Sequence, residues 1–136
     1  MQNSLNITLI QTHLLWEDKT ANLHLFDKYL ESIGKTDVII LPEMFTTGFS
    51  MQPHLFSEDM QGDTLYWIKQ KAFEKKCAIT GSIIIKENDR FYNRLLWVDE
   101  EGNITHYDKR HLFGMAGEDK HYACGKDKTI LSYKGW

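Results

Sequence analysis

The spacing of apolar residues along the chain predicts two amphipathic helices. The first is indicated by four apolar residues at intervals of three and four, which would share one helical face: Leu23, Phe26, Leu30 and Ile33. Gly34 follows at the position where a left-handed cap commonly ends a helix. The second helix is indicated by a shorter set with the same spacing: Leu65, Ile68 and Ala72. Asp63 or Thr64 is available as its N-cap.

Short apolar runs between and after these helices predict strands. Six segments have this character: Leu5–Gln11, Asp37–Leu41, Cys77–Ile85, Phe91–Val98, Asn103–Tyr107 and Thr129–Tyr133. The run "DVIIL" in the second of them is typical of a strand that is covered on both faces. The sequence "DEEG" before Asn103 predicts a hairpin turn. The resulting order, β-α-β-α-β-β-β with a short final strand, indicates an α/β layered domain.

Composition is typical of a single globular domain and excludes several partners. The chain has 136 residues, 42% of them apolar and 26% charged, and contains no repeat or linker. We therefore expect one domain over residues 1–136, with no internal boundary. A net charge of −3 gives no reason to expect nucleic acid or an acidic membrane surface as partner. The absence of a long apolar run or a signal-peptide pattern, together with only two cysteines, predicts a cytoplasmic protein.

Two ionisable residues follow closely on predicted strands. Glu43 comes two residues after one strand, behind Pro42, where we expect it to be held rigidly and partly shielded from water, as suits a general base. Lys109, in the loop "YDKRHLFG", follows another strand and is suited to stabilising an oxyanion. Ligands of open α/β sheets bind beyond the carboxyl ends of strands, so we expect the two residues to meet. Taken alone, each is also compatible with a solvated surface residue, as is Glu118 in its glycine-flanked loop.

The cysteines and histidines suggest weaker alternatives. Cys77 opens a buried strand, and core packing explains it. Cys124 follows His121 by three residues, but catalytic cysteine and histidine normally come from distant positions, so we expect no nucleophile there. The possible metal ligands match no zinc or metalloprotease spacing: His106, His111, His121, Asp108 and Glu118. There is also no glycine-rich phosphate loop, so neither a metal nor a cofactor is expected.

Several motifs, taken in their order and spacing, carry a family resemblance. They are "ITLIQT" near the N-terminus, "LPEMFTTGF" around Glu43, and "YDKRHLF…GED" from Tyr107 to Asp119. Together with "YNRLLWVDEEGNITHYDK", whose hairpin leads to Lys109, they resemble the nitrilase superfamily of carbon–nitrogen hydrolases. The resemblance extends over the whole chain. It implies an α/β fold, the four-layer α-β-β-α sandwich of that superfamily, of which this chain would form only the N-terminal part.

The resemblance also implies the residues of the site. It assigns Glu43 as the base, Lys109 as the oxyanion-stabilising lysine and Glu118 as the second glutamate, acting with a cysteine nucleophile. The run "YDKRHLFGMAGEDKHY" is most similar to the omega-amidase branch, which hydrolyses the terminal amide of 2-oxo-dicarboxylic acid monoamides. Three residues are expected to form the pocket wall, although core packing explains each equally well: Phe49, Phe113 and Met115.

The nucleophile of the family follows a segment that would lie beyond "YKGW", and neither Cys77 nor Cys124 has its sequence context. We therefore expect this chain to be the N-terminal portion of a longer enzyme and inactive by itself. Half of a sandwich would expose the apolar face of its sheet and favour association. The full-length form is expected to be a homo-oligomer, a dimer, that acts on a small-molecule amide. The alternative is a non-catalytic small-molecule-binding or interaction module derived from the same fold.

Overall fold

A five-stranded sheet organises the chain in the computed structural model, which describes residues 4–136. Its strands follow one another in space as in the chain: β1 (Ile7–Leu9), β2 (Val38–Ile40), β3 (Ala78–Glu87), β4 (Arg90–Val98) and β5 (Ile104–Asp108). The helices are α1 (Lys19–Ser32), α2 (Pro53–Phe56), α3 (Asp63–Lys75) and α4 (Glu118–His121), with a 3₁₀ turn η1 (Gly114–Ala116) before α4. The predicted order of the main helices and strands is confirmed, and α2, η1 and α4 are additions to it.

The strand directions bring two loops to one edge of the sheet. β1, β2 and β3 are parallel, whereas β4 is antiparallel to both of its neighbours, β3 and β5. β5 therefore runs in the same direction as β2 and β3, and their carboxyl ends lie at the same edge. Glu43 follows β2 and Lys109 follows β5, so the topology places both residues at this edge.

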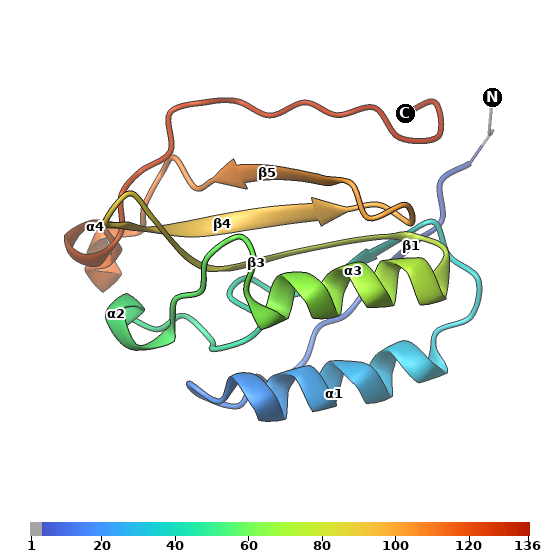
Figure 1. Ribbon diagram of the computed structural model, residues 1–136, viewed down its shortest axis with the longest axis horizontal. Coiled ribbons are helices and arrows are strands. Elements are labelled where there is room, and N and C mark those ends of the chain that lie inside the picture. The colour runs from blue at the N-terminus through green and yellow to red at the C-terminus, as the bar shows by residue number, and fades with distance from the viewer. Residues whose placement is uncertain (1–3) are drawn as a thin grey trace.

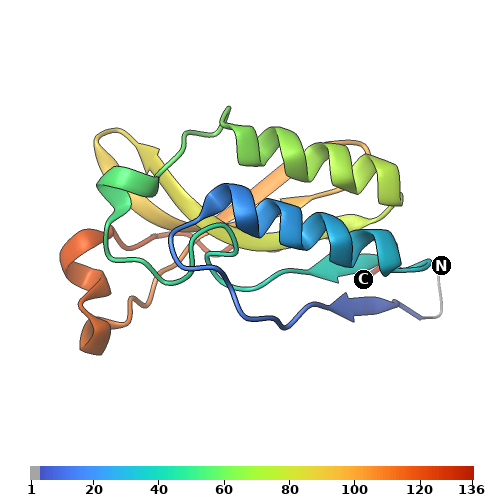
Figure 2. The same ribbon diagram turned by 90° about the horizontal axis from the view of Figure 1, so that it is seen from below.

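α1 and α3 lie side by side and cover one face of the sheet (Figures 1 and 2). Their predicted apolar stripes form the core, with five side chains that are at most 2% exposed: Phe26, Leu30, Leu65, Ile68 and Ala72. Ile39 of β2 and Ile79 of β3 pack against them from the sheet. Burying one such side chain contributes about 1.5–3 kcal/mol, so this contact holds the two layers together.

The C-terminal end of α1 differs from the prediction. The helix ends at Ser32, and the cap residue Ile33 is extended, with its N–H donating to the Leu30 carbonyl oxygen at 3.2 Å. Gly34 does not adopt the left-handed conformation that was expected of it. The chain leaves the helix directly in an extended direction, so no left-handed residue is needed there.

The start of α3 also differs by one residue. The helix begins at Asp63 with Gly62 as its N-cap, so neither Asp63 nor Thr64 is the cap. The backbone N–H of Thr64 lies in the first turn, where a helix offers it no backbone partner, and it donates to Glu58 Oε1 at 3.0 Å. The Glu58 side chain, from the preceding loop, thus accepts a hydrogen bond from the first turn of α3. The prediction had considered only residues at the start of the helix itself.

The predicted final strand, Thr129–Tyr133, is wrong. After α4 the chain runs back alongside β5 (Figure 1), and this segment contributes no strand to the described sheet. Side chains hold it instead. The Tyr133 ring packs edge-on against the Trp97 ring at 5.2 Å between centroids, and Lys134 forms an ion pair with Asp37 at 2.9 Å.

The face of the sheet away from α1 and α3 is covered only in part. Leu9, Thr80 and Trp97 lie in one row across the strands and therefore share this face. Leu9 remains 67% exposed, and Leu95, two residues before Trp97, remains 42% exposed. The chain thus provides one helix layer and one sheet of the four-layer sandwich that the family resemblance implies.

Candidate active site

Glu43 lies on a loop that β3 holds in place. The Met44 N–H donates to Ser82 Oγ at 2.8 Å, and the Phe45 N–H donates to the Ser82 carbonyl oxygen at 3.1 Å. Met44 and Phe45 are fully buried, so the backbone next to Glu43 is fixed. The Glu43 side chain itself is 51% exposed and therefore less shielded from water than the sequence led us to expect.

Lys109 follows directly on β5, and its backbone is held on both sides. Its N–H donates to the Asn93 carbonyl oxygen at 2.9 Å, and its own carbonyl oxygen accepts from the Gly125 N–H at 2.9 Å. The preceding residue, Asp108, is held by the buried Arg94 guanidinium through bonds of 2.6 and 2.8 Å. A Cβ at Gly125 would lie 2.1 Å from the Asp108 carbonyl oxygen, so only glycine permits this approach.

Glu118 begins α4 and is completely buried. Its Oε2 accepts a hydrogen bond from the Phe113 N–H at 2.6 Å, which ties the start of the helix to the preceding loop. At the end of α4, Tyr122 Oη donates to the Ser50 carbonyl oxygen at 2.5 Å, which ties the helix to the loop after Glu43. A residue that looks in isolation like an exposed loop acid is therefore part of the interior.

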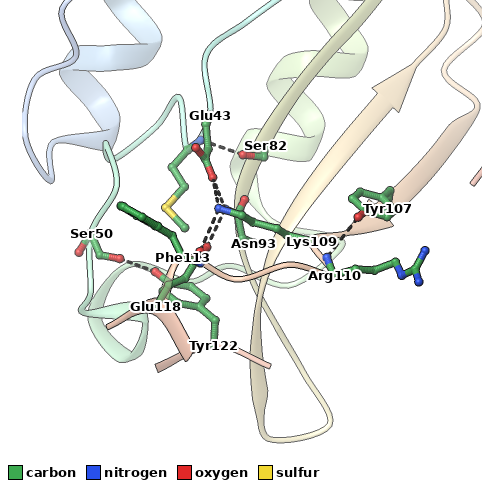
Figure 3. A network of polar contacts seen from close by, with 11 residues as sticks. Glu43, Ser50, Ser82, Asn93, Tyr107, Lys109, Arg110, Phe113, Glu118 and Tyr122 are labelled. Carbon is green, nitrogen blue, oxygen red and sulfur yellow. Dashed lines mark hydrogen bonds and ion pairs between the residues drawn. The ribbon is translucent and has the colours of Figure 1, made fainter. Parts of the chain in front are cut away.

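The three residues expected from the family resemblance meet at the Lys109 ammonium group (Figure 3). Lys109 Nζ lies 2.9 Å from Glu43 Oε1 and 2.9 Å from Glu118 Oε2. Burial by itself would lower the pKa of Lys109, but its hydrogen bonds and ion pairs with Glu43 and Glu118 outweigh burial and raise the pKa above the usual 10.5. The ammonium group therefore stays charged at neutral pH. We call this arrangement of Glu43, Lys109 and Glu118 the lysine junction.

An open pocket of about 220 Å³ adjoins the lysine junction. Its lining combines charged, polar and apolar groups: Leu41, Pro42, Glu43, Ser82, Asn93, Leu95, Tyr107 and Lys109. Leu95 and Tyr107 also border a larger hollow of about 410 Å³ over the partly open face of the sheet. A few convergent polar groups beside apolar walls are typical of a small-molecule site.

The three residues expected to form the pocket wall lie at different distances from the junction. The Phe49 ring centroid is 5.1 Å from Lys109 Nζ and 6.5 Å from the Phe113 ring centroid, so these two aromatic residues are neighbours of the site. Met115, in η1, is 94% exposed. The structure shows none of the three among the residues that line the pocket, and their role in binding stays a prediction.

Neither cysteine lies in this pocket. Cys77 is fully buried in the core, as predicted, and burial raises the pKa of its thiol to about 11. Such a thiol stays protonated at neutral pH and is a poor nucleophile. Cys124 is exposed and lines a separate surface hollow together with Arg110 and His111. The structure thus offers the junction no thiol from the described residues.

Two further sequence expectations concern metals and membranes. Within residues 4–136, no group of three His, Cys, Asp or Glu side chains is placed to hold a metal ion. Asp108 and Glu118, which were possible ligands by sequence, are paired with Arg94 and Lys109. In the same part of the chain, no helix is long and apolar enough to cross a bilayer.

Asn93 is a residue of the site that the sequence analysis missed. Its Nδ2 donates to Glu43 Oε1 at 2.7 Å and to Glu118 Oε1 at 3.1 Å. A signal was present, because asparagine is depleted in strand interiors. Asn93 also has the same alternation phase as Leu95, which predicts that both side chains lie on one face of the sheet.

Comparison with known proteins gives a consistent result. The carbon–nitrogen hydrolase family profile matches residues 6–130. The omega-amidase YafV of Yersinia enterocolitica is 43% identical over 136 residues, which cover 98% of this chain and 52% of that protein. The 2-oxoglutaramate amidase of Bacillus subtilis (strain 168) is 29% identical over 134 residues, which cover 95% of this chain and 51% of that protein. The chain therefore spans about half the length of these relatives.

A solved structure shows the same fold. The crystal structure of a CN-hydrolase superfamily protein from Xanthomonas campestris, with an arsenic adduct in its active site, matches with a TM-score of 0.95 and 39% identity. The match covers 99% of this chain and 51% of that one. Sequence profile, relatives and fold agree over nearly the whole chain, which therefore belongs to the carbon–nitrogen hydrolase family of the nitrilase superfamily.

Proposed function

We propose that this chain supplies the acid–base residues of an amidase that hydrolyses the C–N bond of small linear amides. The observation that carries the proposal is the lysine junction, in which one ammonium group lies 2.9 Å from each of two carboxylates. Glu43 lines an open pocket, whereas Glu118 is fully buried. Two carboxylates in such different surroundings are suited to different roles in one reaction.

Glu43 is the proton carrier in this proposal. Its Oε1 accepts hydrogen bonds from Asn93 and Lys109, but its Oε2 has no hydrogen-bond partner among residues 4–136. That oxygen is free to take up and return a proton. Both oxygens of Glu118 accept hydrogen bonds or ion pairs, and the side chain has no exposed surface. Glu118 is therefore suited to holding Lys109 rather than to exchanging protons.

The reaction also needs a nucleophile, and we propose a cysteine thiol from outside these 136 residues, since neither Cys77 nor Cys124 lines the pocket. The thiol passes its proton to Glu43 and the sulfur attacks the amide carbon. The C–N bond then breaks, and Glu43 returns the proton to the departing ammonia. Lys109 compensates the negative charge on the tetrahedral oxygen. A water that is deprotonated by Glu43 finally hydrolyses the thioester and regenerates the thiol.

As substrates we propose 2-oxo-dicarboxylic acid monoamides, with the terminal amide as the reacting group. The names of two relatives, omega-amidase and 2-oxoglutaramate amidase, support this class. The lining of the pocket also supports this class, because charged groups from Glu43 and Lys109 stand beside an apolar wall that includes Leu95, which suits a short linear amide with a polar reacting end.

The native protein, expressed from its own coding sequence, is expected to release ammonia from a 2-oxo-dicarboxylic acid monoamide, whereas residues 1–136 alone release none. The reason is the thiol, which we place outside these residues. Ammonia release and intact mass are the measurements, and we expect a mass close to twice 16.0 kDa. Turnover by residues 1–136 that disappears in Cys124→Ala would contradict this assignment of the nucleophile.

The positions of the cysteines favour one second candidate, a small-molecule-binding module without catalysis. In that case the native protein binds the monoamide but releases no ammonia. Isothermal titration calorimetry beside the ammonia assay separates the two functions, because binding without turnover is expected only of the module.

We also propose that the native protein is a homodimer, and we expect residues 1–136 alone to self-associate. The self-association of residues 1–136 is expected because apolar side chains on β1 and β4, which the rest of the sandwich would cover in the native protein, are exposed here: Ile7, Leu9 and Leu95. Sedimentation velocity over a range of concentrations measures this association. A chain of residues 1–136 that stays monomeric and unfolds cooperatively would count against it.

A further inference from the structure

Asn93 contacts all three residues of the lysine junction (Figure 3). It lies in β4, paired with Ile84 of β3, and is 2% exposed. Its Nδ2 donates to Glu43 Oε1 at 2.7 Å and to Glu118 Oε1 at 3.1 Å. The backbone carbonyl oxygen of Asn93 accepts a hydrogen bond from the backbone N–H of Lys109 at 2.9 Å. A single strand residue therefore links the loop after β2, the end of β5 and the start of α4.

The chemistry of an amide group suits this position. A carboxylate can only accept hydrogen bonds, whereas the NH₂ of asparagine offers two hydrogens. One nitrogen can therefore serve both glutamates, which a hydroxyl with one hydrogen or a carboxylate with none cannot do. Asn93 also adds no charge to a cluster that already holds two carboxylates and one ammonium group.

The hydrogen bonds of Asn93 distinguish the two oxygens of Glu43. Oε1 accepts from Asn93 and from Lys109, while Oε2 has no partner in the described chain. Glu118, by contrast, accepts from Asn93 at Oε1 and from Phe113 and Lys109 at Oε2. Of the four carboxylate oxygens of Glu43 and Glu118, Oε2 of Glu43 is thus the one that has no hydrogen-bond partner among the residues that the structure describes.

We propose that Asn93 is a positioning residue, which fixes both glutamates against Lys109 and leaves Oε2 of Glu43 as the oxygen that carries the proton. This inference rests on the amidase function proposed above. The terminal bond of a half-exposed glutamate rotates easily, and its two oxygens would otherwise exchange places. Two donors on Oε1 hold one orientation, and correct orientation of a reacting group contributes strongly to rate.

The two amide hydrogens of Asn93 allow a test that leaves Asn93 unchanged. In the native protein, labelled with ¹⁵N at asparagine, each hydrogen gives its own resonance. Glu43→Gln is expected to shift mainly one of the two and Glu118→Gln mainly the other, and both hydrogens are expected to exchange slowly with water. The exposed Asn88 side chain is the reference for fast exchange. Resonances that exchange as fast as those of Asn88 and respond to neither substitution would overturn the proposal.

Substitution of Asn93 gives the functional test. Asn93→Leu removes both donated hydrogen bonds and keeps the same number of side-chain heavy atoms, and Asn93→Ser keeps one donor. We expect kcat of the native protein to fall by about 100-fold in Asn93→Leu and by less in Asn93→Ser, with little change in KM, because a reacting group is misplaced. We also expect the pKa of Lys109, followed by NMR of its ¹³Cε, to fall in Asn93→Leu, since Glu43 is then free to leave the ammonium group.

Thr80→Val is the matched control. Thr80 lies on the neighbouring strand β3, is 8% exposed, and donates from Oγ1 to the Leu96 carbonyl oxygen at 2.7 Å. Its loss removes a buried hydrogen bond without touching the lysine junction, so kcat and the pKa of Lys109 are expected to stay unchanged. If Asn93→Leu behaves like Thr80→Val, Asn93 has no positioning role.

If Asn93→Leu fails to fold, the kcat of Asn93→Ser and the side-chain amide resonances of Asn93 test the positioning role instead. If the native protein hydrolyses no amide, the proposed function fails, and the resonances together with the Lys109 titration still show whether Asn93 holds the two glutamates.

Discussion

Replacing Lys109 with methionine is expected to lower the free energy of unfolding of the native protein by about 3 kcal/mol. The substitution leaves Glu118 in the interior, with no exposed surface and without its cationic partner. Removal of one member of a buried ion pair commonly costs about 3–5 kcal/mol. We expect the lower end, because Glu118 keeps neutral donors from Asn93 and Phe113. Urea-induced unfolding at a fixed protein concentration measures the change.

Lys71→Met is the matched control for this experiment. Lys71 also lies between two carboxylates, 3.0 Å from Asp27 and 3.5 Å from Glu74, but these are 30% and 46% exposed. Surface ion pairs of this kind contribute about 0–1 kcal/mol. In addition, Glu118→Gln combined with Lys109→Met is expected to restore part of the loss, because the uncompensated charge is gone. Equal effects of Lys71→Met and Lys109→Met would show that burial of Glu118 does not govern the stability of the junction.

The main elements of the fold could be predicted from the sequence because they are long and periodic. The stripe that includes Phe26 and Leu30 has helical spacing, and both residues are buried in α1. The start of α3 and the conformation of the last segment of the chain could not be predicted from neighbouring residues alone. Glu58 satisfies the start of α3 from another loop, and Lys134 and Tyr133 hold the last segment by side-chain contacts. Such tertiary contacts leave no periodic pattern in the sequence.

The candidate site, like the fold, could be predicted from local sequence patterns only in part. The meeting of Glu43 and Lys109 could be predicted, because each follows a strand whose carboxyl end lies at the same edge of the sheet. The burial of Glu118 could not, because α4 has only four residues and no apolar stripe. Its interior position depends on Tyr122, which anchors the far end of α4 to the loop after Glu43. The family resemblance supplied Glu118 where local pattern did not.

Replacing Glu43 with glutamine is expected to reduce ammonia release by the native protein by about 10²–10⁴-fold, the usual contribution of a general acid–base group. The amide oxygen of glutamine can still accept from Asn93 and Lys109, but the nitrogen in place of Oε2 cannot take up a proton. The side chain is 51% exposed, so loss of its charge is expected to change the free energy of unfolding by less than about 1 kcal/mol. Initial rates and urea unfolding on the same preparation measure both effects.

Glu74→Gln is the control that separates chemistry from charge. Glu74 is 46% exposed and forms an ion pair with a lysine that also contacts a second carboxylate, so its surroundings resemble those of Glu43, but it does not line the pocket at the lysine junction. We expect its substitution to leave ammonia release unchanged. If Glu43→Gln retains turnover within a few-fold of Glu74→Gln, Glu43 is not the proton carrier. A large loss of turnover in a Glu43→Gln protein that stays stable supports a chemical role for Glu43. Lys109→Met cannot separate a chemical role from a structural one, because it is expected to lower stability and turnover together.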